Sequence, residues 1–300
     1  MNNKKNFSRR NFIKSSSAFS AGLMLHPKNF FVENTVPLYG HLWVYASQYP
    51  PDWDCTPILD TAFNDIKNAG FAGIELMESI VRHEDSVNTL NALKDKYKLP
   101  VVGASYYGDM WDKDQQQYIL EDIQLVIERL HAVGATMLGL TVGDAKRMKT
   151  EDELDVQAET VKKIMTICSS NNIQPNLHNH VFEVKDDLHD LKGTIKRIPD
   201  IKLGPDLNWL IRAGVDPVWF IKTYADKIVF MHIRDQYTNG KWTEYLGQGV
   251  TDFSAIAKAL KEIDYKGRAA IELAFDEPPK NPVKEDWKIS REYVQKVFGW

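Results

Sequence analysis

Short apolar or β-branched runs alternate with longer amphipathic runs from residue 37 to the end of the chain. The short runs have the composition of buried β-strands. Eight of them occur, at residues 37–45, 72–77, 100–107, 135–143, 173–180, 201–208, 227–235 and 268–275. The longer runs repeat apolar residues at three- and four-residue spacing, which predicts helices. The clearest of these cover residues 58–70, 114–134, 152–172, 215–226 and 252–267.

An alternation of strands and helices predicts parallel strands joined by helical crossovers. Eight such units in about 260 residues fit a closed (β/α)₈ TIM barrel better than an open doubly wound sheet. No G-x-G-x-x-G motif follows the first predicted strand and the sequence contains no P-loop motif, which disfavours nucleotide-binding folds. We therefore expect a single α/β domain, a TIM barrel, over residues 37–300.

Composition is compatible with that class. The chain has 300 residues, of which 43% are hydrophobic and 26% charged, as in ordinary soluble globular proteins. Its two cysteines, Cys55 and Cys168, show no C-x-x-C spacing. Neither a disulfide framework nor a zinc knuckle is therefore indicated.

The first 36 residues differ from the rest. Residues 1–14 carry five bases and no acid, and residues 15–25 are mildly apolar but too few to span a bilayer. The run SRRNFIK at residues 8–14 resembles a twin-arginine export signal. The alternative is a disordered basic tail. We expect residues 1–36 to be a twin-arginine-like signal and linker, and the protein to be periplasmic with no stable membrane anchor beyond that signal.

Removing this segment changes the charge of the protein. It holds six bases and one acid, so the remainder carries a formal net charge of −9 against −4 for the whole chain. An acidic body without a basic stripe argues against nucleic acid as a partner.

Carboxylate and imidazole groups stand at the ends of several predicted strands, where the chemistry of a TIM barrel is located. They are Glu75, His178, His180, Asp206, His232, Asp235 and Glu272. An ionised carboxylate in such a place needs a partner, and a bound cation would supply one. Imidazole nitrogen and carboxylate oxygen from different strands favour one divalent transition metal ion such as Mn²⁺, Co²⁺, Zn²⁺ or Fe²⁺.

The same stretches resemble the xylose isomerase-like barrel family, which includes sugar epimerases and isomerases, hydroxypyruvate isomerase, inosose dehydratase and a repair nuclease. The resemblance is carried by GFAGIEL (70–76), LHNHVFE (177–183), LGPDLNW (203–209), MHIRD (231–235), LGQGVTDF (246–253) and AAIEL (269–273). It implies a single metal ion held by His178, Asp206, His232 and Glu272, and a sugar or keto-sugar as the small-molecule substrate.

Two positions depart from the family pattern. The ligand on strand five is usually Glu, whereas His178 stands there in this chain, and this HNH run is closer to the inosose dehydratase branch. Trp209 occupies a position that is a substrate-contacting histidine in many members. Side chains two apart on a strand point the same way, so His178 and His180 both face the barrel mouth. We assign His178 to the metal and His180 to the substrate or second shell, and the reverse assignment remains open.

The resemblance implies an isomerase or epimerase that acts through an enediolate. The alternative is a lyase that dehydrates an inosose or 3-keto-sugar, and a third reading is a metal-independent sugar-binding protein. The resemblance to the nuclease branch is the weakest. With histidine at position 178, the candidate bases are Glu272, Glu183 and Glu75, although Glu183 also fits a solvated loop acid. Further substrate contacts are expected from His180, Trp209, Asp235, Trp43 and Tyr106.

Overall fold

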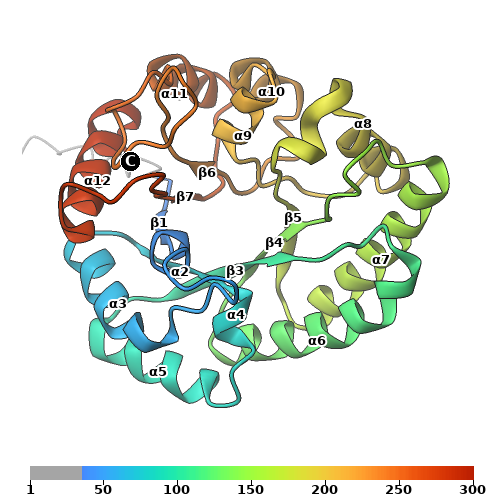
Figure 1. The fold of residues 1–300 in the computed structure, drawn as a ribbon, viewed down its shortest axis with the longest axis horizontal. Coiled ribbons are helices and arrows are strands. Elements are labelled where there is room, and N and C mark those ends of the chain that lie inside the picture. The colour runs from blue at the N-terminus through green and yellow to red at the C-terminus, as the bar shows by residue number, and fades with distance from the viewer. Residues whose placement is uncertain (1–35) are drawn as a thin grey trace, which may run out of the picture. The chain divides into compact units, whose positions relative to one another are not determined.

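The structure, a computed structural model, describes residues 36–300, and the predicted export signal lies outside the described residues apart from its last position. Seven parallel strands run in the order β5-β4-β3-β2-β1-β7-β6, and Figure 1 shows the helices arranged around them. The strands are β1 Leu38–His41, β2 Gly73–Met77, β3 Val101–Tyr107, β4 Met137–Thr141, β5 Gln174–Leu177, β6 His232–Ile233 and β7 Ala269–Ile271. The TIM-barrel prediction is confirmed.

The outer layer consists of helices that alternate with the strands along the chain. The longer ones are α3 Leu59–Asn68, α5 Ser86–Tyr97, α6 Gln116–Ala132, α7 Glu151–Ser170, α8 Val181–Arg197, α11 Phe253–Glu262 and α12 Val283–Phe298. The shorter ones are α2 Trp43–Ala46, α4 Glu78–Val81, α9 Leu207–Arg212 and α10 Pro217–Thr223. Among the described residues, no helix has the length and apolar character needed to cross a membrane.

The expected sixth strand, residues 201–208, is reduced to single-residue bridges. Leu203 bridges to β5 and to the chain ahead of β6, and Asp206 bridges to His232. Pro205 lies between these bridges and has no N–H group to donate, which prevents a continuous ladder. The bridges nevertheless join β5 to the segment that leads into β6 and so complete the ring of strands.

The expected first strand, residues 37–45, ends early. β1 stops at His41, and the chain turns into α2 at Trp43. The backbone N–H of Trp43 donates to Nδ1 of His41 over 3.1 Å, which ties the start of the turn to the end of the strand. Trp43 therefore lies on a short helix above the barrel mouth and not on a strand.

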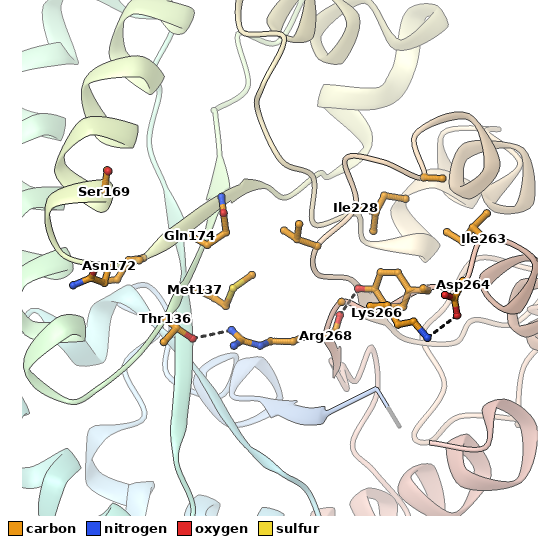
Figure 2. Close-up of a pocket in the computed structure, with 15 residues that line it drawn as sticks. Thr136, Met137, Ser169, Asn172, Gln174, Ile228, Ile263, Asp264, Lys266 and Arg268 are labelled. Atoms are coloured by element: carbon orange, nitrogen blue, oxygen red, sulfur yellow. Dashed lines mark hydrogen bonds and ion pairs between the residues drawn. The ribbon is translucent and has the colours of Figure 1, made fainter. Parts of the chain in front are cut away.

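The amino-terminal and carboxyl-terminal ends of the barrel are lined by different kinds of side chain. Its interior near the strand starts is filled by Tyr39, Val102, Met137, Phe230 and Ala270. Outside that layer, a cavity of about 810 Å³ opens at the amino-terminal end (Figure 2). Its charged groups are satisfied locally, because Arg268 donates to Thr136 over 2.7 Å and Lys266 pairs with Asp264 over 2.6 Å. The candidate chemistry lies at the opposite end.

Candidate active site

Four side chains converge at the carboxyl-terminal end of the strands. His178 follows β5, Asp206 precedes α9, His232 lies on β6 and Glu272 follows β7. Each offers a nitrogen or oxygen atom, and these atoms lie within 4.8 Å of one another. All four residues are buried. The structure thus brings together the four residues that the sequence named as metal ligands.

Asp206 presents its two carboxylate oxygens to different partners. Oδ1 accepts the backbone N–H groups of Asn208 and Trp209 at 2.9 and 3.0 Å, which caps α9. Oδ2 points to the ligand cluster and lies 2.8 Å from Nε of Arg234. Burial raises the pKa of Asp206, and the charge of Arg234 counteracts part of that rise. One oxygen therefore caps the helix, and the other faces the ligand cluster, where it is paired with Arg234.

The ring of His232 is oriented by Glu75. Its Nε2 atom lies 2.7 Å from Oε2 of Glu75, and its Nδ1 atom lies 2.9 Å from Oε2 of Glu272. Burial alone would lower the pKa of His232, but the two carboxylates raise it to about 10. A carboxylate that holds the outer nitrogen of a histidine is the usual support of a metal ligand, since it leaves the inner nitrogen facing the metal. The geometry favours a positioning role for Glu75, because its side chain contacts His232 and does not line the cavity, and its catalytic role stays a prediction.

Arg234 completes the electrostatics of the cluster and was missed in the sequence. Its guanidinium group pairs with Asp206 and with Glu272, and its side chain is buried. Burial alone would raise the pKa of Glu272, but Arg234 and the neighbouring histidines hold it well below the usual range. The residue lies two positions after His232 on an extended segment, so the period-two rule would have placed it on the same face.

The composition of the cluster fits one divalent cation. Three carboxylates, those of Glu75, Asp206 and Glu272, against the single charge of Arg234 leave a formal charge of −2 when the histidines are neutral. Among the described residues, Nδ1 of His178 is a buried atom without a hydrogen-bond partner, whereas Nδ1 of His232 and Oδ2 of Asp206 have ion-pair contacts alone, with Glu272 at 2.9 Å and Arg234 at 2.8 Å. A cation among them would satisfy all three, and two imidazoles with two carboxylates suit Mn²⁺, Co²⁺, Zn²⁺ or Fe²⁺.

A second group of ligand-type residues, His41 with Glu75 and His232, does not form a separate metal site. Nε2 of His41 lies 2.9 Å from Oγ of Ser105, and its Nδ1 accepts the N–H of Trp43. Both ring nitrogens are therefore engaged. Burial lowers the pKa of His41, which keeps the ring neutral. His41 was not singled out in the sequence, although it stands at the end of the first strand.

A cavity of about 530 Å³ opens beside the ligand cluster. Its lining includes four predicted substrate contacts, Trp43, Tyr106, His180 and Trp209. The hydroxyl of Tyr106 donates to Asp122 over 2.8 Å, so its polar end is already occupied. The other lining side chains include Trp53, Met77, Glu78, Ser105, Tyr107, Thr141 and Trp242.

His180 lies beside His178, and both line the cavity. Their rings meet edge to face with centroids 5.1 Å apart. His180 also packs against Phe182 and Trp209, at 5.2 and 5.5 Å between ring centroids. Burial lowers the pKa of His180 to about 4. Only His178 belongs to the four-residue cluster, so the geometry favours His178 as the ligand and His180 as a group facing the substrate.

The position of Glu183 differs from both interpretations of the sequence, a base at the substrate and a solvated loop acid. It is buried and does not line the cavity. Its carboxylate accepts the backbone N–H groups of His180 at 2.7 Å and Val142 at 3.2 Å, which caps α8 and ties it to the end of β4. Burial raises its pKa to about 8. Glu183 is therefore neither a solvated loop acid nor a residue in contact with the cavity.

Asp235 organises a loop instead of lining the cavity. Its carboxylate accepts the backbone N–H groups of Gly247 at 3.0 Å and Gly249 at 2.8 Å, together with those of Gln236 and Thr251. A Cβ atom at Gly249 would overlap this carboxylate, so the close approach requires glycine. The geometry thus favours a role for Asp235 in positioning the segment 246–251, and its contact with a substrate stays a prediction.

The chain matches the xylose isomerase-like TIM barrel family over residues 63–295. It is 20% identical over 285 residues to an inosose dehydratase of Clostridium beijerinckii, which covers 83% of this chain and 93% of that protein. Among solved structures it resembles a D-allulose 3-epimerase from Methylomonas sp., with a TM-score of 0.71, 17% identity and coverage of 87% of this chain and 98% of that chain.

An L-ribulose 3-epimerase gives a TM-score of 0.72 at 16% identity and covers 88% of this chain and 95% of that chain. The likeness to both solved structures concerns the fold, whereas the family match spans well over half of the sequence. The chain belongs to the xylose isomerase-like TIM barrel family.

Proposed function

We propose that this protein is a divalent-metal-dependent isomerase or epimerase of a sugar or keto-sugar. The observation that carries the proposal is the convergence of His178, Asp206, His232 and Glu272 within 4.8 Å beside a cavity of about 530 Å³. The names of the similar proteins support a sugar substrate, because they include an inosose dehydratase and two sugar 3-epimerases. What these names have in common is that each describes a sugar-modifying enzyme.

A cation held by the four residues would polarise a sugar carbonyl and stabilise the enediolate that forms when the adjacent C–H group loses its proton. The proton itself must move to and from side chains of this chain. Glu272 lines the cavity, but it is paired with Arg234 and His232. His180 and Glu78 line the cavity without belonging to the ligand cluster. They follow β5 and β2, two strands that are not neighbours.

We assign proton transfer to His180 and Glu78. Nδ1 of His180 is a buried atom with no hydrogen-bond partner in the described part of the chain, which leaves it able to accept a proton. Burial raises the pKa of Glu78, which favours a carboxyl group that donates a proton. If the proton is removed from one face of a carbon and returned to the opposite face, the configuration of that carbon is inverted, which is epimerisation. If the proton is returned to the neighbouring carbon, the sugar is isomerised.

Dehydration is the second candidate, and a specific observation favours it. The ligand cluster contains His178 where most members of the family have a carboxylate, and the sequence relatives are inosose dehydratases. The first step, proton removal next to a carbonyl, is the same. The outcome differs because a hydroxyl group then leaves from the next carbon as water.

The first test is the metal content of protein purified without chelator, measured by mass spectrometry beside the Asp206→Ala, His232→Ala double variant. We expect about one equivalent of a transition metal in the native protein and loss of it in the variant, with circular dichroism as the control for folding. The Asp65→Asn variant, which alters a buried carboxylate outside the site, should keep its metal. Absence of metal, and no uptake of Mn²⁺, Co²⁺ or Zn²⁺, would overturn the proposal.

A second test separates the reactions. Keto-sugars are incubated with metal-loaded protein in deuterated water and analysed by mass spectrometry. Deuterium in recovered sugar without loss of water supports isomerisation or epimerisation, and a product lighter by one water supports the lyase. His180→Gln and Glu78→Gln should retain the metal and lose exchange. Retained exchange in both variants would refute their assignment.

We also propose that residues 1–36 export the protein by the twin-arginine route to the periplasm. The support is the SRRNFIK run. Replacement of Arg9 and Arg10 by lysine should leave the protein in the cytoplasm, as followed by cell fractionation. Unchanged periplasmic recovery would contradict this.

A further inference from the structure

The cavity at the barrel mouth is larger than one sugar ring requires. A hexose has twelve non-hydrogen atoms, and even at the roughly 30 Å³ that one water molecule takes in the liquid these fill less than about 360 Å³. The cavity measures about 530 Å³. A single ring bound at the ligand cluster would therefore leave a substantial part of this volume to something else.

The cavity has two chemically different parts. His178, His232 and Glu272 of the ligand cluster come from the ends of β5, β6 and β7. The other part, over β1, β2 and β3, contains none of the four ligands, and we call it the outer subsite. It is lined by Trp43, Trp53, Met77, Ser105 and Tyr107. Aromatic faces beside hydroxyl groups match a sugar ring, whose C–H face contacts an aromatic ring while its hydroxyl groups take hydrogen bonds.

Trp53 is held in the outer subsite by a strained backbone. It has φ +50, in the left-handed region that bulky residues rarely adopt. Its backbone is fixed on both sides, since its N–H donates to Tyr49 and its carbonyl accepts from Ser79, both over 2.8 Å. Its ring packs against Trp43 with centroids 5.4 Å apart, yet the residue is 39% exposed. A strained residue that keeps a large aromatic side chain exposed at the mouth of a cavity points to ligand binding.

The charge of the cavity argues against a phosphorylated sugar. Arg234 is the one permanently cationic side chain among the described residues that line it. Its guanidinium group is already paired with Asp206 and Glu272. Glu78 adds a carboxyl group to the cavity lining, and the outer subsite adds no cation. A phosphate would therefore meet no free positive partner there.

We propose that the outer subsite binds a second, uncharged sugar ring, so that the substrate is a neutral glycoside of disaccharide size. This deepens and rests on the proposed function, because the reacting ring lies at the ligand cluster. Tyr107, which is 46% exposed, and Trp53 offer the aromatic contacts for the second ring. An aromatic side chain of this kind offers a large contact area to the sugar ring and loses little side-chain entropy on binding.

The test is calorimetric titration of metal-loaded protein with cellobiose, maltose, lactose and trehalose beside glucose and glucose 6-phosphate. We expect at least one disaccharide to bind ten times more tightly than glucose, and glucose 6-phosphate to bind no better than glucose. Trp53→Ala and Tyr107→Ala should each reduce the ratio of disaccharide to glucose affinity at least fivefold. Trp219→Ala is the matched control, because Trp219 lies on α10, is 46% exposed and does not line the cavity.

Three results would overturn the second subsite: glucose bound as tightly as every disaccharide, an affinity ratio that survives in both aromatic variants, or tightest binding of glucose 6-phosphate. These results are distinguishable from failure of the proposed function, which is read from metal content and deuterium incorporation. Protein that holds metal and exchanges protons without a preference for disaccharides would lose only the subsite. Protein that takes up no metal would lose the proposed function.

Discussion

Glu75 offers a sharp test of the metal site, because it contacts a ligand without being one. The Glu75→Gln substitution keeps the shape of the side chain and an oxygen that can accept the proton on Nε2 of His232, now at 2.7 Å. It removes one negative charge and changes the formal charge of the cluster from −2 to −1. We therefore expect a lower metal affinity in a protein that still folds.

Two bounds set the size of this effect. At an effective dielectric constant of about 20, a unit charge about 7 Å from a divalent ion, one imidazole ring away, contributes at most about 5 kcal/mol. The amide retains the hydrogen bond, so only part of this is lost. Carboxylates behind metal-bound histidines typically change metal affinity by about 10- to 100-fold, or about 1.4–2.7 kcal/mol. We expect the dissociation constant to rise about 30-fold.

The assay is competition for Co²⁺ or Zn²⁺ against a fluorescent chelator at pH 7.5. Asp65→Asn is the control, because Asp65 is also a buried carboxyl group and accepts a hydrogen bond from Tyr45 over 3.0 Å. It should bind the metal as the native protein does. A dissociation constant for Glu75→Gln within threefold of the native value would refute the assignment of Glu75 to the support of His232.

Three further predictions concern stability. Thr150→Ala removes the capping box with Glu153 at the start of α7 and should lower the free energy of unfolding by about 1 kcal/mol in urea titrations. Burial raises the pKa of Asp286 to about 6, whereas an aspartate in the unfolded chain titrates near 4. The free energy of unfolding of the native protein should therefore fall as pH rises from about 4 to 6. The Asp286→Asn variant should not show that fall and should be more stable than the native protein at pH 7 by roughly 1 kcal/mol. Equal pH profiles of the two proteins would contradict this prediction. Gly249→Ala places a methyl group against the Asp235 carboxylate and should destabilise the protein by about 1–3 kcal/mol, and an unchanged urea midpoint would show that the loop yields.

The sequence was sufficient for the barrel and for the meeting of the four ligand-type residues. The reason is geometric, since parallel strands in a barrel bring their carboxyl ends to one face. Asp206, His232 and Glu272 stand at the ends of three successive predicted strands, so their proximity followed from the fold class alone. The lengths of the strands could not be predicted from the fold class, because Pro205 interrupts the sixth strand and the hydrogen bond between Trp43 and His41 ends the first.

The partners of the ligands could not be predicted in the same way. Glu75 contacts His232 across the barrel, and two strands, β1 and β7, lie between theirs in the sheet. No local spacing encodes such a contact. Glu183 was misread for a related reason: the cap it forms at the start of α8 also receives the N–H of Val142. Because Val142 is far from Glu183 in the sequence, the residues around Glu183 do not distinguish a buried helix cap from a solvated loop acid.

The two parts of the cavity differ in how they are built, and this difference explains what sequence reasoning can reach. The ligand cluster is mounted on strand ends, whose positions the fold prescribes. Trp53 lies on the loop after α2, and its orientation depends on a left-handed backbone that Tyr49 and Ser79 hold in place. Loops of this kind carry specificity on a rigid scaffold. The residues of the ligand cluster can therefore be predicted from the strands, whereas the outer subsite can be recognised only once the loop is folded over them.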